Sequence, residues 1–253
     1  MPAEISLCFF AFLAGFIDSV AGGGGLIQLP ALFIFLPGLP VAMLLGTNKF
    51  ASICGTSIAA VQYARHIKIN WAATFPATAS ALLFSFLGAR VVTLLDPGIM
   101  RPLVLVMLIG IAAYTFLRKD FGSLHVPKLG SVKQLSVSIA TGMVIGFYDG
   151  FFGPGTGSFL IFVFIGIFGF SFLAASASSK VINFATNLSA VLYFGFTHNI
   201  LFKIAILMAV FNILGAIAGT KLAILKGNRF VRIFFLFIVS AMIVRLGYDV
   251  LMR

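Results

Sequence analysis

Charged residues are scarce in this sequence. Asp, Glu, Lys and Arg together make up 9% of its 253 residues, whereas a soluble domain carries roughly 25%. Hydrophobic residues account for 61% and the mean hydropathy is +1.15, so polar side chains are too few to cover a water-soluble globule. The composition predicts an all-α, polytopic integral membrane protein that lies in a lipid bilayer.

Cysteine and histidine are also scarce, which leaves little for metal or catalytic chemistry. Cys8 and Cys54 lie in apolar runs without a nearby His pair, so neither a zinc site nor a disulfide scaffold is expected. His66, His125 and His198 fall in or beside loops, and no Ser-His-Asp order or GxxxxGK phosphate loop occurs. We therefore expect no enzyme activity, no catalytic residue, no metal and no cofactor.

Acidic residues are the rarest charged class, with six against seventeen basic residues and a net charge of +11. In a soluble protein such an excess can indicate nucleic-acid binding. Here the basic residues lie mostly between apolar runs and are not interleaved with aromatic residues. We interpret them as the orientation signal of a membrane protein and expect no nucleic-acid partner.

Apolar runs divide the chain into two similar halves. Most runs are long enough for a spanning helix, which needs about 20 residues. Residues 26–36 and 158–170 are too short to span upright, and each follows a glycine cluster, which is typical of a broken helix or a re-entrant segment. The runs are Glu4–Ala21, Leu26–Leu36, Val41–Ala64, Trp71–Leu95, Ile99–Leu117, Leu135–Phe152, Ser158–Phe170, Phe172–Phe196, Ile200–Leu225 and Phe230–Leu251.

A constant offset of 131 residues relates the two halves without a gap. We therefore predict a first transmembrane repeat at residues 1–118, a basic linker at 119–133 and a second transmembrane repeat at 134–253. The matched pairs include Gly15 with Gly146, Asp18 with Asp149, Gly22 with Gly153, Gly24 with Gly155, Lys49 with Lys180, Gly88 with Gly219 and Arg101 with Arg232.

Loop charges predict how the halves are oriented. An odd number of crossings per half places ten basic residues on one side of the membrane and four on the other, whereas four crossings per half give six against eight. The positive-inside rule favours the odd number. The halves are then inverted repeats, the linker is cytoplasmic and both termini lie outside the cytoplasm. Charge counting leaves open whether the short segments span or re-enter.

The glycine clusters indicate a binding site at a helix terminus. Glycines in a helix interior cost roughly 1 kcal/mol each relative to alanine, and a helix that begins just after such a break offers backbone N–H groups to an anion. The alternative is that the glycines only permit close helix packing. The candidate ligands are Gly23, Gly24 and Gly25 in the first half and Gly155, Thr156 and Gly157 in the second.

Two lysines lie near the starts of long apolar runs. An ammonium inside a membrane segment costs about 2.5–3.5 kcal/mol on insertion scales. Each lysine could reach the nearer interface along its flexible stem, but equivalent positions in inverted halves favour convergence on a central anion site. The candidate substrate ligands are Lys49 and Lys180 with the neighbouring donors Thr47, Asn48, Ser179, Asn183 and Asn187.

Asp18 and Asp149 are the carboxylates that lie well inside apolar runs. A buried acid is expensive unless it is paired. Either the two acids cap the following turn or pair with the lysines, which is a structural role, or they bind protons and couple transport to a proton gradient. Both interpretations stay open on the sequence.

Two motifs resemble the signatures of a known family. The stretch GFIDSVAGGGGLI at residues 15–27, followed by Pro30 and by GTNK at residues 46–49, is similar to the first signature of the TauE/SafE sulfite exporter family. The stretch GFYDGFFGPGTG at residues 146–157 is similar to the second. The resemblance covers nearly the whole chain and implies a bacterial or archaeal inner-membrane transporter of sulfur-containing anions such as sulfite, thiosulfate or sulfonates.

The function predicted from these observations is secondary transport of a small sulfur oxyanion by alternating access, with the site between the repeats. No ATP motif is present, so an ion or substrate gradient must drive transport, with protons as the candidate coupling ion. An anion channel and a transporter of a non-sulfur anion are the alternatives. A membrane-embedded enzyme is more distant, and a homodimer is left open.

Overall fold

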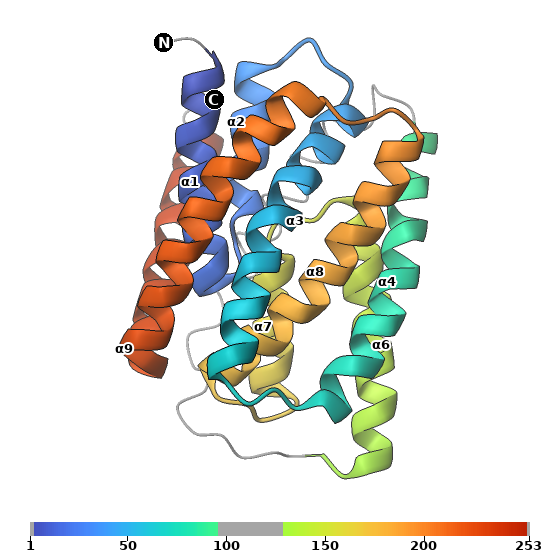
Figure 1. Ribbon diagram of the computed structural model, residues 1–253, viewed down its shortest axis with the longest axis vertical. Coiled ribbons are helices and arrows are strands. Elements are labelled where there is room, and N and C mark those ends of the chain that lie inside the picture. Colours follow the sequence, from blue (N-terminus) through green and yellow to red (C-terminus); the bar gives the residue numbers. More distant parts are fainter. Residues whose placement is uncertain (1–2, 96–128, 252–253) are drawn as a thin grey trace.

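The computed structural model describes residues 3–95 and 129–251, with only the backbone of the helix after Gly227, and in this part the regular structure is entirely helical (Figure 1). Within these described ranges, three helices are long and apolar enough to cross a membrane: Ala3–Ala21, Trp71–Leu94 and Phe202–Gly227. The elements are α1 (Ala3–Ala21), α2 (Gly25–Phe35), α3 (Val41–His66), α4 (Trp71–Leu94), α6 (Ser131–Phe151), α7 (Thr156–Gly166), α8 (Phe172–Phe196) and α9 (Phe202–Leu251).

These helices confirm the all-α prediction and follow the apolar runs closely. Helices α3, α4 and α8 begin at Val41, Trp71 and Phe172, the first residues of their predicted runs. One difference lies in α9, which joins the last two runs into one element that is broken at Gly227, where φ is 72°. The predicted run at 99–117 lies outside the described residues.

The short helices form hairpins with the helices that precede them. The rings of Phe10 on α1 and Phe35 on α2 are 6.0 Å apart, so α2 runs back along α1 towards the end of the bundle where α1 begins. Helix α7 likewise turns back after α6, and it packs mainly against α8. Both short helices contain 11 residues, or about 16 Å at 1.5 Å per residue. Each therefore covers about half of a hydrocarbon core of roughly 30 Å.

Helices whose first residues are 131 positions apart run in opposite directions. Helices α3 and α8 are antiparallel. Gly46, near the start of α3, lies against Phe194, near the end of α8, whereas Tyr63, near the end of α3, lies near Ser176, close to the start of α8. Helices α1, α3 and the part of α9 before Gly227 run one way, and α4, α6 and α8 run the other (Figure 1). The pairs α3 with α8, α4 with α9 and α2 with α7 have starting residues 131 positions apart.

The helices of the two halves are interleaved. Helix α1 packs against α9, and α6 packs against α4, while α3 and α8 contact each other in the middle. Small residues allow this close approach: Gly15 lies against the backbone of Asn212, and Gly146 lies against the backbone of Ala81. The last two contacts are again related by 131 positions, so the packing repeats from one half to the other.

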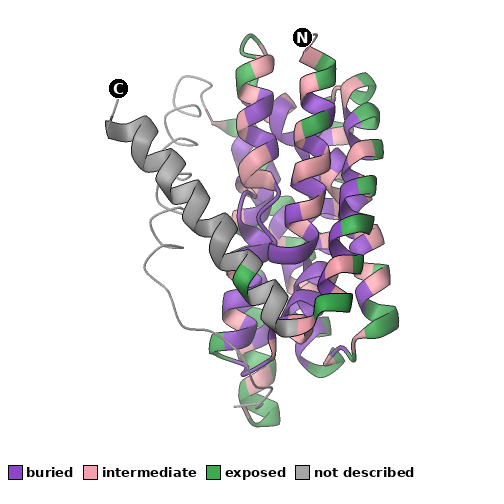
Figure 2. Cartoon of the chain, turned by 90° about the vertical axis from the view of Figure 1, so that its left-hand side faces the viewer, coloured by how far each residue is buried: buried purple, intermediate pink, exposed green. Residues whose placement is uncertain are grey.

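The outer surface is apolar and the ends carry the charge. Large apolar side chains are exposed on the outside of the bundle, including Phe75, Leu83, Val144 and Ile206, while buried residues fill its middle (Figure 2). This surface suits contact with lipid. The end of the bundle where α3 ends and α4, α6 and α8 begin is called the basic end, because the exposed residues Arg65, Lys68, Lys133, Lys221 and Lys226 gather there. Exposed Arg90 and Lys203 lie at the opposite end.

Candidate functional site

Two ion pairs cross between the halves at the centre of the bundle. The Nζ atom of Lys49 on α3 lies 2.7 Å from Oδ2 of Asp149 on α6. The Nζ atom of Lys180 on α8 lies 2.7 Å from Oδ2 of Asp18 on α1. Each lysine therefore pairs with the acid of the other half, so the two halves exchange partners.

The two pairs differ in burial and in the other contacts that they make. The side chains of Lys49 and Asp149 are 3% and 2% exposed, whereas those of Lys180 and Asp18 are 0% and 18% exposed. Thr56 donates a second hydrogen bond of 3.4 Å to Asp18 Oδ2. Apart from Lys49, no donor contacts Asp149 Oδ2 in the described part of the chain. The carboxylate of Asp149 thus depends on a single partner.

Local backbone structure explains why both acids need a cation. Asp18 and Asp149 lie in the last turns of α1 and α6, where the helix dipole places partial negative charge. That charge disfavours a carboxylate and favours a lysine nearby. Helix α1 ends at Ala21, and the next residue, Gly22, has a φ of 79° and donates its N–H to the carbonyl of Asp18. The helix terminus and the acid are therefore positioned together by one turn.

The tips of the two hairpins touch beside these pairs. The N–H of Ser158, near the start of α7, donates to the carbonyl of Gly22 at 3.1 Å. The hydroxyl of Ser158 donates to the carbonyl of Ala21 at 3.0 Å. A Cβ atom on Gly22 would overlap the backbone of Gly157. The hairpins thus enter from opposite ends of the bundle and meet at its centre.

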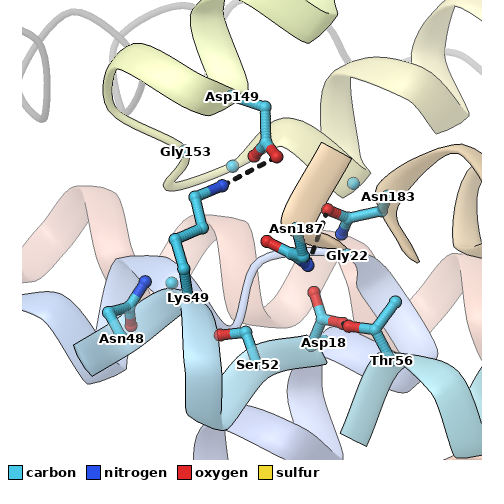
Figure 3. Close-up of a pocket in the computed structure, with 13 residues that line it drawn as sticks. Asp18, Gly22, Asn48, Lys49, Ser52, Thr56, Asp149, Gly153, Asn183 and Asn187 are labelled. Carbon is cyan, nitrogen blue, oxygen red and sulfur yellow. Dashed lines mark hydrogen bonds and ion pairs between the residues drawn. The ribbon is translucent and has the colours of Figure 1, made fainter. Parts of the chain in front are cut away.

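A pocket of about 310 Å³, including the open space at its mouth, lies at this meeting point (Figure 3). Helices from both halves line it. Most of the site residues predicted from the sequence are among its walls: Lys49, Asn48, Gly25, Gly155, Gly157, Asn183, Asn187, Asp18 and Asp149.

Several predicted site residues do not line this pocket. The hydroxyl of Thr47 donates to the carbonyl of Met43 and accepts the N–H of Leu201, so it holds helix ends together. The hydroxyl of Thr156 donates to the carbonyl of Gly153 within its own turn. Outside the walls lie Lys180, Gly23, Gly24, Thr47, Thr156 and Ser179.

Four wall residues were not among the predicted ligands: Gly22, Gly153, Ser52 and Thr56. Ser52 and Thr56 share a helical face with Lys49 at i+3 and i+7, so the periodicity of α3 contained the signal. Gly22 and Gly153 both adopt positive φ, at 79° and 96°, and each begins the turn of its hairpin. Their position within the glycine clusters was the sequence feature that could have identified them as wall residues.

The walls offer several groups that suit a small anion. Helices α2 and α7 begin at Gly25 and Thr156, so two positive helix termini lie at the pocket. Lys49 adds a full positive charge. The side-chain amides of Asn48, Asn183 and Asn187 are hydrogen-bond donors in the walls, and Asn187 donates to Asn183 at 3.2 Å. The Oδ1 atom of Asn48 is buried without a hydrogen-bond partner, and as an acceptor it suits the hydroxyl of a protonated ligand and not a charged oxygen. Polar side chains here have capacity for a ligand.

Two other polar residues of the apolar runs, Gln28 and Asn212, bond to each other away from the pocket walls. Asn212 Nδ2 donates to Gln28 Oε1 at 2.9 Å and to the carbonyl of Ala11 at 3.2 Å. These bonds tie α9 to α2 and to α1. Among the described residues, no three His, Cys, Asp or Glu side chains gather as metal ligands would.

Comparison with known proteins gives a consistent result. The family profile described as "Sulfite exporter TauE/SafE" matches residues 7–246. A Sinorhizobium protein named as a probable membrane transporter protein is 36% identical over 239 residues, which cover 94% of this chain and 90% of the relative. Relatives named in the same way from Haemophilus influenzae and Escherichia coli K12 are 34% identical over 244 and 263 residues, covering 94% and 98% of this chain and 92% and 91% of the relatives. No solved structure matches the chain.

Proposed function

Because the chain belongs to the sulfite exporter TauE/SafE family, as its two signature motifs predicted, we propose that it is a secondary transporter of small sulfur-containing anions. The protein is a multi-pass membrane protein of a transporter family and not an enzyme. Sulfite, thiosulfate and organosulfonates form the proposed substrate class.

The observation that carries the proposal is the pocket between the hairpin tips. It combines the ammonium of Lys49 with the N-termini of α2 and α7. Positive helix ends and a cation bind an oxyanion without any covalent chemistry. Amides of Asn48, Asn183 and Asn187 supply further hydrogen bonds, and Asp18 and Asp149 are the proposed proton sites.

The two halves are proposed to be inverted repeats that move relative to each other. The opposite directions of α3 and α8, and of α1 and α6, support this arrangement (Figure 1). One hairpin reaches the pocket from each end of the bundle, so displacement of one hairpin would open the pocket to one side only. This is the alternating-access geometry of transporters with broken helices at the substrate site.

The membrane orientation follows from the distribution of charge. The basic end faces the cytoplasm in this proposal, because cytoplasmic loops carry the excess of Lys and Arg. The predicted linker, residues 119–133, runs into α6, which begins at Ser131 at that end. The proposed location is a bacterial or archaeal inner membrane, with the start of α1 on the outer side.

The test is transport by the purified protein in liposomes. Uptake of sulfite, thiosulfate, taurine and sulfate is followed with and without a pH gradient, and saturable uptake of at least one sulfur anion is expected. The control replaces one ion pair with neutral residues, Lys49→Met with Asp149→Asn. Loss of a charge-assisted contact of about 1.5–3 kcal/mol should reduce uptake by roughly ten- to a hundredfold.

The outcomes distinguish the alternatives. Absence of flux for every sulfur anion would contradict the proposed substrate class, and other small anions would then be tried on the same liposomes. A channel would be identified by anion flux that rises linearly with anion concentration and depends only on the electrochemical gradient of that anion.

A further inference from the structure

The pocket and the two ion pairs contain two positive and two negative side chains, so the empty site is neutral. Lys49, Asp18 and Asp149 line the pocket, and Lys180 lies directly behind Asp18 with no exposed surface. A bound anion adds a negative charge that none of these groups balances. An unbalanced charge is expensive in an apolar interior, so the anion must arrive with a compensating positive charge.

A proton could supply the compensating positive charge, and the two acids are not equally able to bind it. Asp18 keeps a cation that an anion in the pocket would not remove, because its partner Lys180 does not line the pocket; its weaker second partner, the hydroxyl of Thr56 at 3.4 Å, does line it. Asp149 Oδ2 has Lys49 as its partner, and Lys49 lines the pocket. An anion that binds Lys49 therefore competes directly with Asp149, and the carboxylate that loses its cation can remain buried only if it is protonated.

We infer that Lys49 and Asp149 form the exchangeable pair of the site, and that the site takes up a sulfur monoanion together with one proton, which resides on Asp149. The pair of Lys180 with Asp18 then serves to hold α8 against α1. This inference rests on the proposed function, narrows its substrate class and assigns the proton to one of its two candidate acids. Hydrogensulfite and sulfonates fit one released lysine and one proton, whereas sulfate and thiosulfate carry a second charge that nothing in the site balances.

Other ionisable groups near Asp149 do not change this charge balance. Helix α7 contains none, and α4 contributes Arg90, which is exposed at its end. Lys49 on α3 and Asp18 on α1 line the same pocket as Asp149. The other ionisable groups of α6 and α8 are Tyr148 and the exposed Lys133 on α6, and Lys180 and Tyr193 on α8. The hydroxyls of Tyr148 and Tyr193 bond to Pro154 and Thr93.

The experiment compares charge and proton movement in wild-type proteoliposomes. Radiolabelled sulfite, methanesulfonate and sulfate are the probes, an internal pH dye reports protons, and protein-free liposomes correct for passive entry of sulfur dioxide. We expect one proton to enter per hydrogensulfite. Accumulation should follow the pH difference, about tenfold per unit, and should not respond to a potassium diffusion potential. Sulfate uptake should be at least tenfold slower than sulfite uptake.

Variants identify the acid. In Asp149→Asn, sulfite should still enter, but its uptake should become insensitive to the pH gradient and sensitive to the membrane potential. Glu4→Gln, which changes an exposed acid far from the pocket, should keep wild-type coupling. Sulfite uptake that follows the membrane potential and not the pH gradient in the wild type would overturn the inference. So would equal uptake of sulfate, or coupling that survives Asp149→Asn. Absence of any sulfur-anion flux would instead contradict the proposed function itself.

Discussion

At the scale of single residues, the main feature is that each buried lysine depends on an acid from the other half. Lys180 has no exposed side-chain surface and pairs with Asp18. Removing one member of a buried pair leaves the other charge without compensation, which typically costs 3–5 kcal/mol, whereas removing both costs much less. The role assigned to this pair is structural, so its loss should appear in stability.

We therefore expect Lys180→Met to lower the free energy of unfolding by about 3–5 kcal/mol, and the double variant Lys180→Met with Asp18→Asn to recover most of that loss. Thermal unfolding of the purified proteins in detergent measures both. Lys203→Met is the matched control, since Lys203 is 88% exposed and its 3.5 Å contact with Glu4 lies at the surface. An equal loss in the single and double variants would show that the pairing does not stabilise the fold.

Residue positions in this site were predictable from the sequence, but their partners were not. The offset of 131 residues identified Asp18, Asp149, Lys49 and Lys180 as equivalent pairs. It could not say that Lys49 contacts the acid of the other half, because equivalence fixes position within each half and not the packing between halves. The repeat also predicted the same ligand role for both lysines, although of the two only Lys49 lines the pocket.

At the scale of elements, the hairpins are defined by glycines at their tips. The sequence located the breaks between α1 and α2 and between α6 and α7, because glycine clusters interrupt apolar runs. It left their direction open, since length and hydropathy do not distinguish a second crossing from a return. The Phe10 and Phe35 contact, which places α2 alongside α1, resolves the direction for the first hairpin.

Two adjacent glycines at the first tip should respond very differently to alanine. Gly22 has a φ of 79°, and a Cβ atom there would overlap the backbone of Gly157, whereas the nearest atoms to a Cβ on Gly23 lie at 3.7 Å. The left-handed conformation alone costs a non-glycine residue roughly 1–2 kcal/mol, and the overlap adds to it. Gly22→Ala should thus reduce both the unfolding temperature and sulfite uptake.

Gly23→Ala serves as the control for that substitution and should leave both properties close to those of the wild type. The unfolding temperature is measured in detergent and uptake in liposomes. If Gly22→Ala is tolerated as well as Gly23→Ala, the two hairpin tips are not in contact in the membrane.

At the scale of the whole molecule, the charge distribution gives a testable orientation. Lys68, in the connection between α3 and α4, lies at the basic end, and Lys203, at the start of α9, lies at the opposite end. Both side chains are exposed. The positive-inside rule assigns Lys68 to the cytoplasm and Lys203 to the outside.

Single cysteines at these two positions test the assignment in intact cells. The starting protein carries Cys8→Ala and Cys54→Ala, which removes both natural cysteines. A membrane-impermeant thiol reagent should label Lys203→Cys directly and Lys68→Cys only after the cells are permeabilised, while the cysteine-free protein stays unlabelled. The reverse pattern would invert the proposed orientation.

The exchange of ion-pair partners between the halves has a consequence for biosynthesis. Asp18 and Lys49 are made first, and their native partners Lys180 and Asp149 are added 162 and 100 residues later along the chain. At roughly 5–20 residues per second, the first half waits on the order of ten seconds in or beside the insertion machinery with its acid and its base both unmatched. Neither half can therefore form its buried ion pairs without the other half. Correct insertion of the second half is the event that lets the first half reach its final structure.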